Sequence, residues 1–301
     1  MSRLPTLKPG DSVEIIAPAS RCSDNQLIQL KELLTSWGLS CIVADDIFKT
    51  SDLPFLANTD EYRFNALKKA IERPETKAII CARGGYGSMR LTPRFNEIIP
   101  PATPKLLIGM SDITALLLYF QQEWKWPAMH GTLNTDKCSP ESIAAIKDIV
   151  FGTKDHITFQ GKPLNAAARQ NTSFASSITG GNVCLVQASI GTLWQMQGKD
   201  RIIFLEEVGE RGYRLDRMLE QCQQANLFKD ATAIVFGDFL ECNEPDGSSL
   251  MQNVLTHFAK QCAIPVIHIQ GIGHGFVNFP LLFGTSAALQ CGTDITLMCH
   301  R

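Results

Sequence analysis

The sequence lacks an excess of charge of either sign, and it lacks any long hydrophobic run. Its 28 lysines and arginines nearly balance 30 aspartates and glutamates, which gives a formal net charge of −2. Such a balance does not favour binding to nucleic acid or to an anionic membrane surface. No stretch reaches the roughly 20 uninterrupted apolar residues of a membrane span, and charged residues interrupt the first apolar run, unlike in a signal peptide. We therefore expect a cytoplasmic protein that binds neither nucleic acid nor membrane.

Paired cysteines and histidines, the usual ligands of structural metals, are also missing. The ten cysteines form no C-x-x-C pair and the six histidines form no H-x-x-x-H pair. Zinc sites draw their ligands from such clusters, so we expect no metal. Since the sequence shows no secretion signal, we expect the cysteines to be reduced and mostly buried.

What the sequence does contain is ample apolar material, arranged as alternating strands and helices. Hydrophobic residues make up 45% of the 301 and charged residues 19%, as in a globular protein of one large or two smaller domains. Buried strands that alternate with amphipathic helices predict a parallel sheet covered on both faces, and ligands bind at the carboxyl ends of such strands. In the first half we predict strands over 13–17, 41–44, 78–82 and 106–109, and helices over 24–37, 60–71 and 112–122.

The alternation weakens in the middle of the chain and then returns. A helix is expected to start at Ser139-Pro140, but residues 159–173 are polar and aperiodic, which predicts a connector. We therefore predict two domains, 1–135 and 176–301, joined by a connector over 136–175. In the second domain we predict strands over 201–205, 233–237, 266–269, 283–289 and 295–299, and helices beginning near 183, over 213–224 and over 249–262.

Ser111 follows a predicted strand and opens a predicted helix in the segment GMSD. In such a tight turn the hydroxyl projects from the sheet edge, and the helix start presents free N–H groups and a partial positive charge. This is the arrangement of a nucleophile elbow, although the last glycine of G-x-S-x-G is missing. The structural alternative is that Ser111 or Asp112 only caps the helix.

A second strand-to-loop junction is the glycine-rich segment RGGYG, which begins at Arg83. Its three glycines let the backbone turn with positive φ and approach a ligand closely, so its N–H groups are candidates for binding an oxyanion. The segment matches neither a Walker loop nor a correctly placed dinucleotide fingerprint, so it predicts no nucleotide cofactor. The structural alternative is a simple glycine-rich turn.

A hydroxyl nucleophile needs a base, and the base needs an orienting acceptor. His274 lies between glycines in a predicted loop, where its ring is free to be presented. Glu206 ends a predicted strand, where a carboxylate is placed to hold an imidazole. His130 is a rival base. The structural alternatives are a turn histidine at 274 and charged residues at a sheet edge, for which Glu207 or Glu210 is the better fit.

Eight segments follow one another across nearly the whole chain: LKPGDSVEIIAPAS, ARGGYGSMRL, IGMSDITALL, MHGTLN, ITGGNVCLV, RIIFLEEVGERGYRLDRML, AIVFGDFLEC and GIGHGFVNFPLLFGTSAAL. In this order they resemble the serine LD-carboxypeptidase family, the muramoyl-tetrapeptide carboxypeptidases and their microcin-immunity relatives. The resemblance implies an α/β protein with a Rossmann-like parallel-sheet N-terminal domain that carries the nucleophile. It also implies a β-rich C-terminal α/β domain that carries the Glu and His, an active site between the two, and a homodimer.

The resemblance implies a carboxypeptidase that uses neither metal nor cofactor. It would hydrolyse the L-to-D amide that holds the terminal D-alanine of murein tetrapeptides, during cell-wall recycling. The family often has Glu-Asp where this chain has Glu-Glu, and the first acid is the one that matches. The implied roles are nucleophile for Ser111, base for His274, its partner for Glu206, and oxyanion-hole N–H donor for Asp112. A second N–H donor is implied to come from the glycine-rich loop, where Gly85 is the candidate and the other glycines stay open.

Contacts with the substrate are less well defined by the sequence. Arg83, Tyr86 and Asn182 are candidate substrate-binding residues, whereas Arg90 fits a solvated surface better. One alternative is the same chemistry on peptide–nucleotide toxins, for which Trp124 and Trp126 are candidates to stack on an adenine. The other alternative is a muropeptide-binding module without catalytic activity.

Overall fold

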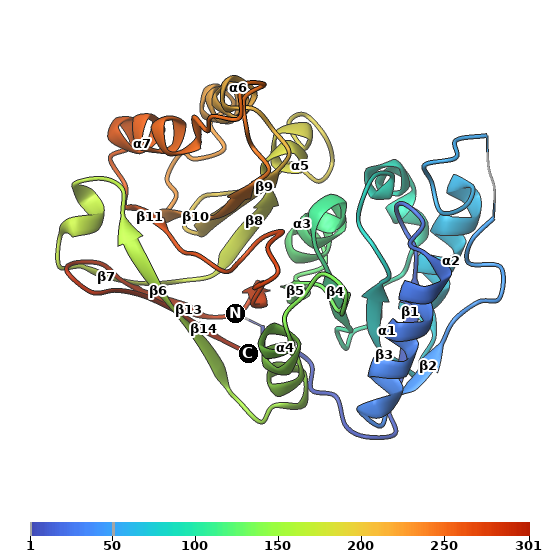
Figure 1. The fold of residues 1–301 in the computed structure, drawn as a ribbon. Coiled ribbons are helices and arrows are strands. Elements are labelled where there is room, and N and C mark those ends of the chain that lie inside the picture. The colour runs from blue at the N-terminus through green and yellow to red at the C-terminus, as the bar shows by residue number, and fades with distance from the viewer. Residues whose placement is uncertain (1, 50–51) are drawn as a thin grey trace.

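Two β-sheets organise the chain in the computed structural model, which describes residues 2–49 and 52–301. Figure 1 shows the first sheet and its helices on one side, in blue to green, and most of the second sheet with its helices on the other, in yellow to red. The protein is thus an α/β protein, with a parallel-strand first sheet and a larger second sheet, as the sequence predicts.

The first sheet has the strand order β12-β5-β4-β3-β1-β2. The five strands from the first half of the chain pair in parallel. Their order reverses between β1 and β3, and in such sheets ligands bind outside the carboxyl ends at the reversal. The strands are β1 (Ser12–Ile16), β2 (Ser40–Ile42), β3 (Thr76–Cys81), β4 (Leu106–Gly109), β5 (Ala128–His130) and β12 (Leu281–Phe283).

Helices connect these parallel strands, as the alternation predicts. The first begins at a capping box, in which Ser23 and Gln26 satisfy each other's backbone N–H groups. The predicted helix over 112–122 is divided into a 3₁₀ turn and an α-helix. The helical segments are α1 (Asp24–Ser36), α2 (Asp60–Glu72), η1 (Ser88–Glu97), η2 (Ser111–Ile113) and α3 (Thr114–Gln122).

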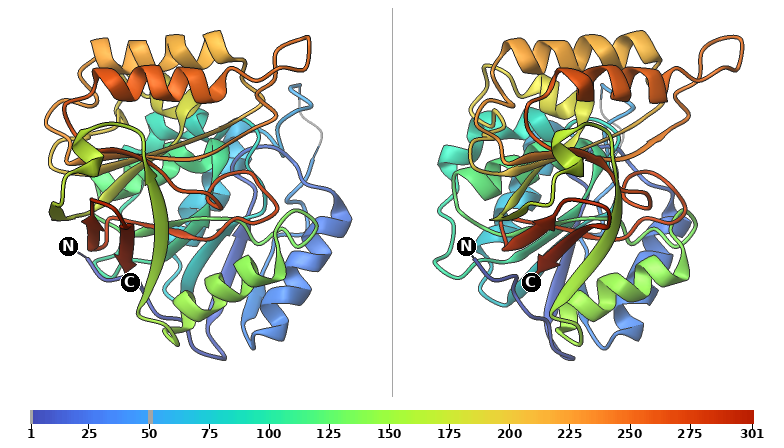
Figure 2. Two further views of the ribbon diagram at one scale, coloured as in Figure 1. Left: turned by 60° about the vertical axis from the view of Figure 1, so that its left-hand side comes forward. Right: turned by 90° about the vertical axis from the view of Figure 1, so that its left-hand side faces the viewer.

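The second sheet has the order β7-β13-β14-β6-β11-β10-β9-β8. Strands β8 to β11 are parallel, and the remaining pairs are antiparallel. In Figure 2, α6 and α7 lie side by side above the sheet. The elements are β6 (His156–Pro163), β7 (Ser173–Ser176), β8 (Ile178–Asn182), α5 (Val183–Ala188), β9 (Ile202–Val208), α6 (Gly212–Gln224), β10 (Ala233–Leu240), α7 (Met251–Gln261), β11 (Val266–His268), β13 (Ala287–Gln290) and β14 (Ile295–His300).

Two expectations for secondary structure are corrected. Residues 159–173 are not an aperiodic connector, because β6 pairs with both β14 and β11. Only Phe159 of this strand is buried, so the segment carries no apolar alternation to mark it. The single strand predicted over 283–289 is divided, since Gly284 turns the chain with a φ of +76°. β12 then joins the first sheet, antiparallel to β5, while β13 joins the second.

The segment 136–175 also contains α4 (Pro140–Phe151), which begins at the Ser139 cap as predicted, and η3 (Ala167–Arg169). The two-domain division with a connector over 136–175 stays a prediction.

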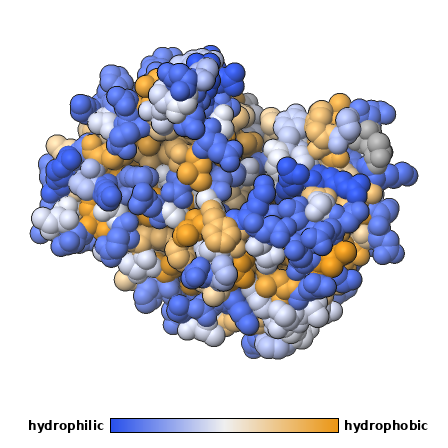
Figure 3. All heavy atoms as spheres, viewed as in Figure 1, coloured by the Kyte–Doolittle hydropathy of each residue, from blue (hydrophilic) through white to orange (hydrophobic). Residues whose placement is uncertain are grey.

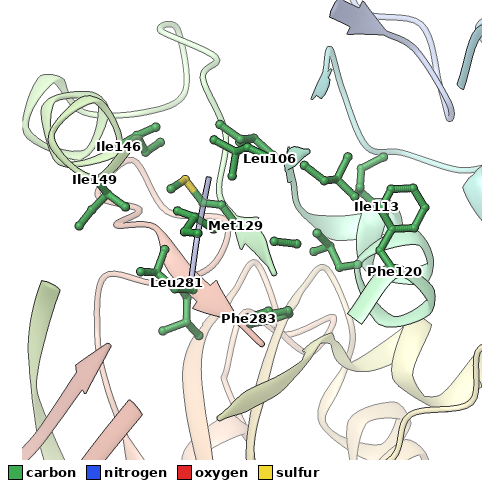
Figure 4. Close-up of a cluster of buried hydrophobic side chains, with 14 of the residues drawn as sticks. Leu106, Ile113, Phe120, Met129, Ile146, Ile149, Leu281 and Phe283 are labelled. Carbon is green, nitrogen blue, oxygen red and sulfur yellow. The ribbon is translucent and has the colours of Figure 1, made fainter. Parts of the chain in front are cut away.

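A continuous hydrophobic core joins the two halves of the molecule. Side chains from β4, α3, β5, α4 and β12 pack together in Figure 4, among them the labelled Leu106, Met129 and Leu281. The same cluster includes Phe204 of β9 in the second sheet. Each fully buried large apolar side chain contributes roughly 1.5–3 kcal/mol. The core therefore holds the carboxyl ends of both sheets in fixed relation.

The surface in Figure 3 is mostly hydrophilic, with small separate hydrophobic areas. All ten cysteines are free, and six of them are buried. Among the described residues, no helix is long and apolar enough to cross a lipid bilayer. Within the same residues, no three His, Cys, Asp or Glu side chains are grouped in a way that would bind a metal ion.

Candidate active site

Ser111 lies on a sharp turn between β4 and α3, at the carboxyl end of the first sheet. Its φ is +61°, a left-handed conformation that strains a residue with a side chain. The turn is tight, since a Cβ on Gly109 would lie only 2.6 Å from a methyl carbon of Ile113. The cap residue here is Met110, without a side-chain hydrogen bond, so Ser111 does not cap the helix. Its partly exposed hydroxyl stands at the turn as in a nucleophile elbow.

The glycine-rich loop after β3 packs directly against Ser111. A Cβ on Gly84 would lie 3.0 Å from Ser111 Cβ and 3.3 Å from Ser111 Oγ, so a larger residue would crowd the hydroxyl. Gly85 has a φ of +101°, and the Ser20 side chain occupies the space where its Cβ would be. Ser20 also accepts a hydrogen bond from the Tyr86 amide at 3.1 Å. The loops that follow β1, β3 and β4 therefore meet at Ser111.

Backbone N–H groups of Asp112 and Gly85 donate to no acceptor within the described residues. The Asp112 side chain is engaged elsewhere, because its Oδ2 accepts the Ser88 amide at 2.7 Å. It therefore caps η1 rather than its own helix. Free N–H groups beside a nucleophile are the donors that stabilise an oxyanion.

Glu206 and His274 form a short hydrogen bond. Glu206 Oε2 lies 2.6 Å from His274 Nδ1. The Glu206 side chain is fully buried in β9, whereas His274 retains 19% side-chain exposure in the loop after β11. An ionised carboxylate can only accept, so Nδ1 carries the proton and Nε2 is left free to act as a base. His274 is thus held by a carboxylate, and it is not an isolated turn histidine.

The same hydrogen bond governs the ionisation of both side chains. Burial raises the pKa of Glu206, but the nearby His130 ring and the hydrogen bond and charge of His274 outweigh it and lower that pKa to about 2. Burial lowers the pKa of His274, but the hydrogen bond and charge of Glu206 outweigh it, and the net pKa is raised. Glu207 and Glu241 add to this rise through their charge. The site therefore favours an anionic Glu206 and stabilises an imidazolium at His274.

The loop that carries His274 is held from two sides. Asp238 of β10 accepts the Gly271 amide at 3.1 and 3.2 Å. On the other side, Asn278 Oδ1 accepts the Gly273 amide at 3.1 Å. These bonds fix the backbone immediately before His274.

Asn278 also reaches the serine turn. Its Nδ2 donates to Met110 Sδ at 3.2 Å, and Met110 precedes Ser111. One buried amide thus links the residue before the serine with the residue before the histidine. Within the described residues no hydrogen bond joins Ser111 Oγ to His274 itself. Catalytic hydrogen bonds are often loose before substrate binds and tighten in the complex.

Comparison with known proteins assigns both halves of the chain. Residues 13–131 match the LD-carboxypeptidase N-terminal domain, and residues 175–289 match the LD-carboxypeptidase C-terminal domain. A Rickettsia conorii protein, named provisionally as a carboxypeptidase, is 36% identical over 95% of this chain and 90% of its own. The chain belongs to the LD-carboxypeptidase family.

Other proteins similar to this LD-carboxypeptidase family member cover the chain equally well. The murein tetrapeptide carboxypeptidase of Pseudomonas aeruginosa is 28% identical over 95% of both chains. The structure of muramoyltetrapeptide carboxypeptidase from Oxalobacter formigenes has a TM-score of 0.80 and 23% identity, covering 96% of this chain and 99% of its own. The microcin C7 self-immunity protein MccF has a TM-score of 0.82 and 17% identity, covering 100% and 99%. At these identities the two solved structures support the fold.

In this LD-carboxypeptidase family member, Glu207 points away from His274. Successive strand residues face opposite sides of a sheet, and Glu207 accepts Asn182 Nδ2 at 2.7 Å and the Cys184 amide at 2.8 Å. Burial raises the pKa of Glu207 to about 7, although these hydrogen bonds oppose the rise. Glu207 thus holds the start of α5, and only the first acid of the pair contacts the histidine.

The three candidate substrate-binding residues are placed differently from one another. Arg83 is exposed and donates to the Arg21 carbonyl at 2.8 Å. Tyr86 is 41% exposed, and its ring lies edge-on to Phe55 at 5.6 Å. Asn182 is buried, caps α5 and bonds to the Glu207 carboxyl group, so its side chain does not line an open surface.

Three further residues discussed from the sequence have structural partners. Arg90 forms an ion pair with Asp60 at 2.6 Å. Trp124 and Trp126 pack against each other and against Phe120, with ring centroids 4.3 to 5.7 Å apart. This aromatic cluster belongs to the core. The suggestion that these tryptophans stack on an adenine is therefore wrong.

Sequence reasoning missed two residues that support the site. Asn278 is a lone buried polar residue in a largely apolar segment, and that contrast was its only signal. Arg63 is 2% exposed, and its guanidinium donates to the carbonyls of Pro18 and Gly87, the latter at 2.9 Å. In the sequence, Arg63 could have been noticed because it is a charged residue on the same helix face as the buried Leu67. Arg63 thereby ties the loop after β1 to the glycine-rich loop.

Proposed function

We propose that this protein is a serine carboxypeptidase that hydrolyses the L-to-D amide bond holding the terminal D-alanine of murein tetrapeptides. The observation that carries the proposal is the pairing of a strained, partly exposed Ser111 with a separate Glu206–His274 hydrogen bond at 2.6 Å. These are the nucleophile and the oriented base that acyl transfer through a serine requires. The murein tetrapeptide specificity of a relative points to the same substrate class.

In the first half of the reaction, Ser111 Oγ attacks the carbonyl carbon of the scissile amide. His274 Nε2 takes the hydroxyl proton, and Glu206 stabilises the imidazolium that forms. The tetrahedral oxyanion accepts hydrogen bonds from the backbone N–H groups of Asp112 and Gly85. Loss of one such donor costs roughly 3–4 kcal/mol of transition-state stabilisation in other serine hydrolases.

In the second half, His274 delivers its proton to the leaving D-alanine, whose amine departs with the electrons of the broken C–N bond. Water then attacks the ester on Ser111, and His274 repeats the transfer in the same order. The carboxylate of the departing residue needs a cation or N–H donors. We assign that contact to Arg83, with Tyr86 beside it, because Arg90 is held by Asp60.

The proposal extends to the setting of the reaction. A tetrapeptide released from murein is a substrate for a cytoplasmic enzyme of cell-wall recycling, and we place the protein there, as a homodimer. Cell fractionation tests the cytoplasmic location, and the molar mass in solution tests the homodimer.

The proposal is tested by incubating the purified protein with a muramoyl tetrapeptide in EDTA and following D-alanine by mass spectrometry. We expect release by the parent, and a loss of at least about 10³-fold in Ser111→Ala and in His274→Ala, as for other members of such triads. Arg169→Ala, an exposed change away from the site, is the matched control and is expected to behave as the parent.

A second candidate substrate is a peptide–nucleotide conjugate. The likeness to MccF favours it, because one solved MccF structure contains glutamyl sulfamoyl guanosine. The same assay with such a conjugate distinguishes the two candidates. If only the conjugate is cleaved, the conjugate and not the muropeptide is the substrate. If neither is cleaved but the muropeptide still binds, the protein is a binding module.

A further inference from the structure

His130 lies beside the Glu206 carboxylate in the interior of the molecule. It ends β5 and has no exposed surface. Its ring stacks on Phe283 at a centroid distance of 5.9 Å and lies edge-on to Phe204 at 5.3 Å. A substrate cannot reach an imidazole enclosed in this way, so His130 is not the rival base that the sequence left open.

Three polar atoms at this place have no hydrogen-bond partner among the described residues: Glu206 Oε1, His130 Nδ1 and His130 Nε2. The nearest approach between them is 3.8 Å, from His130 Nε2 to Glu206 Oε1. A buried carboxylate oxygen without a donor is strongly disfavoured, and more so when it carries charge. Only a small closing movement separates this contact from hydrogen-bond distance.

We propose that His130 is a positioning residue that donates Nε2–H to Glu206 Oε1 when the site is engaged by substrate, while Glu206 Oε2 holds His274. This rests on the proposed function, in which Glu206 orients the catalytic base. The carboxylate then has a donor on each oxygen, and its plane is fixed relative to the His274 ring. No proton or chemical group is transferred between His130 and the substrate.

The surrounding charges favour such a donor. Glu207 follows Glu206 in β9, and Asp238 lies on the neighbouring strand β10, and each of these acids interacts unfavourably with the Glu206 charge. Like charges in a buried site favour protonation of one of them. His274 opposes this from one side only. An N–H of His130 that donates from the other side adds to this opposition.

The position of His130 also couples the carboxylate to the serine turn. In the sheet, His130 pairs with Gly109 of β4 on one side and with Leu281 of β12 on the other. Gly109 lies two residues before Ser111. The strand that ends at His130 therefore sets the spacing between the nucleophile's strand and Glu206.

Two substitutions separate this role from simple packing. In His130→Gln the side-chain amide retains an N–H donor near the Nε2 position, whereas His130→Met fills similar space without a donor. We expect kcat to fall ten- to a hundredfold in His130→Met with KM within threefold, and His130→Gln to keep kcat within about fivefold of the parent. Equal kcat values in the two variants would overturn the proposal.

Nuclear magnetic resonance of the ligand-free parent tests the proposal without any activity. We expect the His130 ring to carry a proton on Nε2, and the Glu206 carboxyl carbon to show its ionised shift. A His130 proton on Nδ1 alone would refute the role of His130 even if the enzyme is active. If the parent releases no D-alanine but shows the proton on Nε2, the proposed function fails while the proton placement assigned to His130 stands.

Discussion

At the level of single residues, the candidate site contains side chains whose placement costs free energy, through backbone strain or through burial of a charge. Ser111 is held at a φ of +61°, and Glu206 is an acid with no exposed surface. Strain and buried charge persist only where the surroundings over-determine them, and such positions concentrate at functional sites. The Glu206–His274 hydrogen bond is therefore the feature on which residue-level changes should act most strongly.

Removing the charge of Glu206 should weaken the base and change its pH dependence. In the parent, the pKa of His274 is raised, so activity should fall as pH decreases through a midpoint above that of an ordinary histidine. In Glu206→Gln we expect kcat/KM to fall on the order of 10²–10⁴-fold, and the midpoint of the acid limb to move to lower pH. The measurement is the pH–rate profile of kcat/KM for both proteins.

Glu207→Gln is the matched control for that experiment. Glu207 bonds to Asn182 and to the start of α5, and it affects His274 only through its charge. We expect a smaller shift of the acid limb in the same direction and less than about tenfold loss of kcat/KM. If Glu207→Gln lost as much activity as Glu206→Gln, Glu206 would not be the specific partner of His274.

At the level of elements, the site depends on loops that are tied to one another. The Asn278 amide joins the loop after β11 to the turn after β4, through Gly273 and Met110. Because the Gly273 N–H is a donor, Asn278 Oδ1 must face it, and this orientation directs Asn278 Nδ2 towards Met110 Sδ. Movement of either loop would therefore be transmitted to the other.

We expect Asn278→Ala to lower both activity and stability. The change leaves the buried Gly273 N–H without its acceptor, which costs about 1–3 kcal/mol of unfolding free energy. It should reduce kcat more than it raises KM, since it misplaces the base relative to the nucleophile. Met110→Leu is the comparison, because it removes only the weak sulfur acceptor and should have a small effect on both. Denaturant unfolding and steady-state kinetics check the two variants. Wild-type kcat in Asn278→Ala would contradict a positioning role.

At the level of the whole molecule, the candidate site draws its residues from both sheets. β12 leaves the second half of the chain to pair with β5 of the first sheet, and the core cluster runs through both sheets. Ser111 comes from the end of β4, whereas Glu206 and His274 come from β9 and the loop after β11. The shared core fixes the relative positions of these three residues.

Much of this arrangement could be predicted from the sequence. Strands such as 106–109 are buried on both faces and therefore read as continuous apolar runs, and the Ser139 cap marked its helix correctly. β6 could not be found in this way, because its pairing partners β11 and β14 lie more than a hundred residues further along the chain and its exposed side chains are polar. The division of 283–289 depended on Gly284, whose positive φ has no signature in an apolar segment.

For the site, sequence patterns identified residue types at strand ends but not their contacts. Glu206 and Glu207 look alike in their local pattern, and the resemblance alone selected Glu206; the structure places Glu206 Oε2 2.6 Å from His274 Nδ1. Arg63 and Asn278 act through backbone carbonyl and amide groups, which no side-chain motif records. Trp124 and Trp126 were candidates for stacking on an adenine, whereas Trp126 is buried in the core and Trp124 packs against it.

The most direct test is to identify the residue that becomes covalently modified by a serine-reactive fluorophosphonate, by peptide mass mapping. We predict modification of Ser111 in the parent, at a rate that falls at least about 10²-fold in His274→Ala, because the base activates the hydroxyl. Modification should be absent at this peptide in Ser111→Ala. Release of D-alanine by a parent whose Ser111 stays unmodified, or modification at another serine that abolishes release, would contradict the assignment of Ser111 as nucleophile.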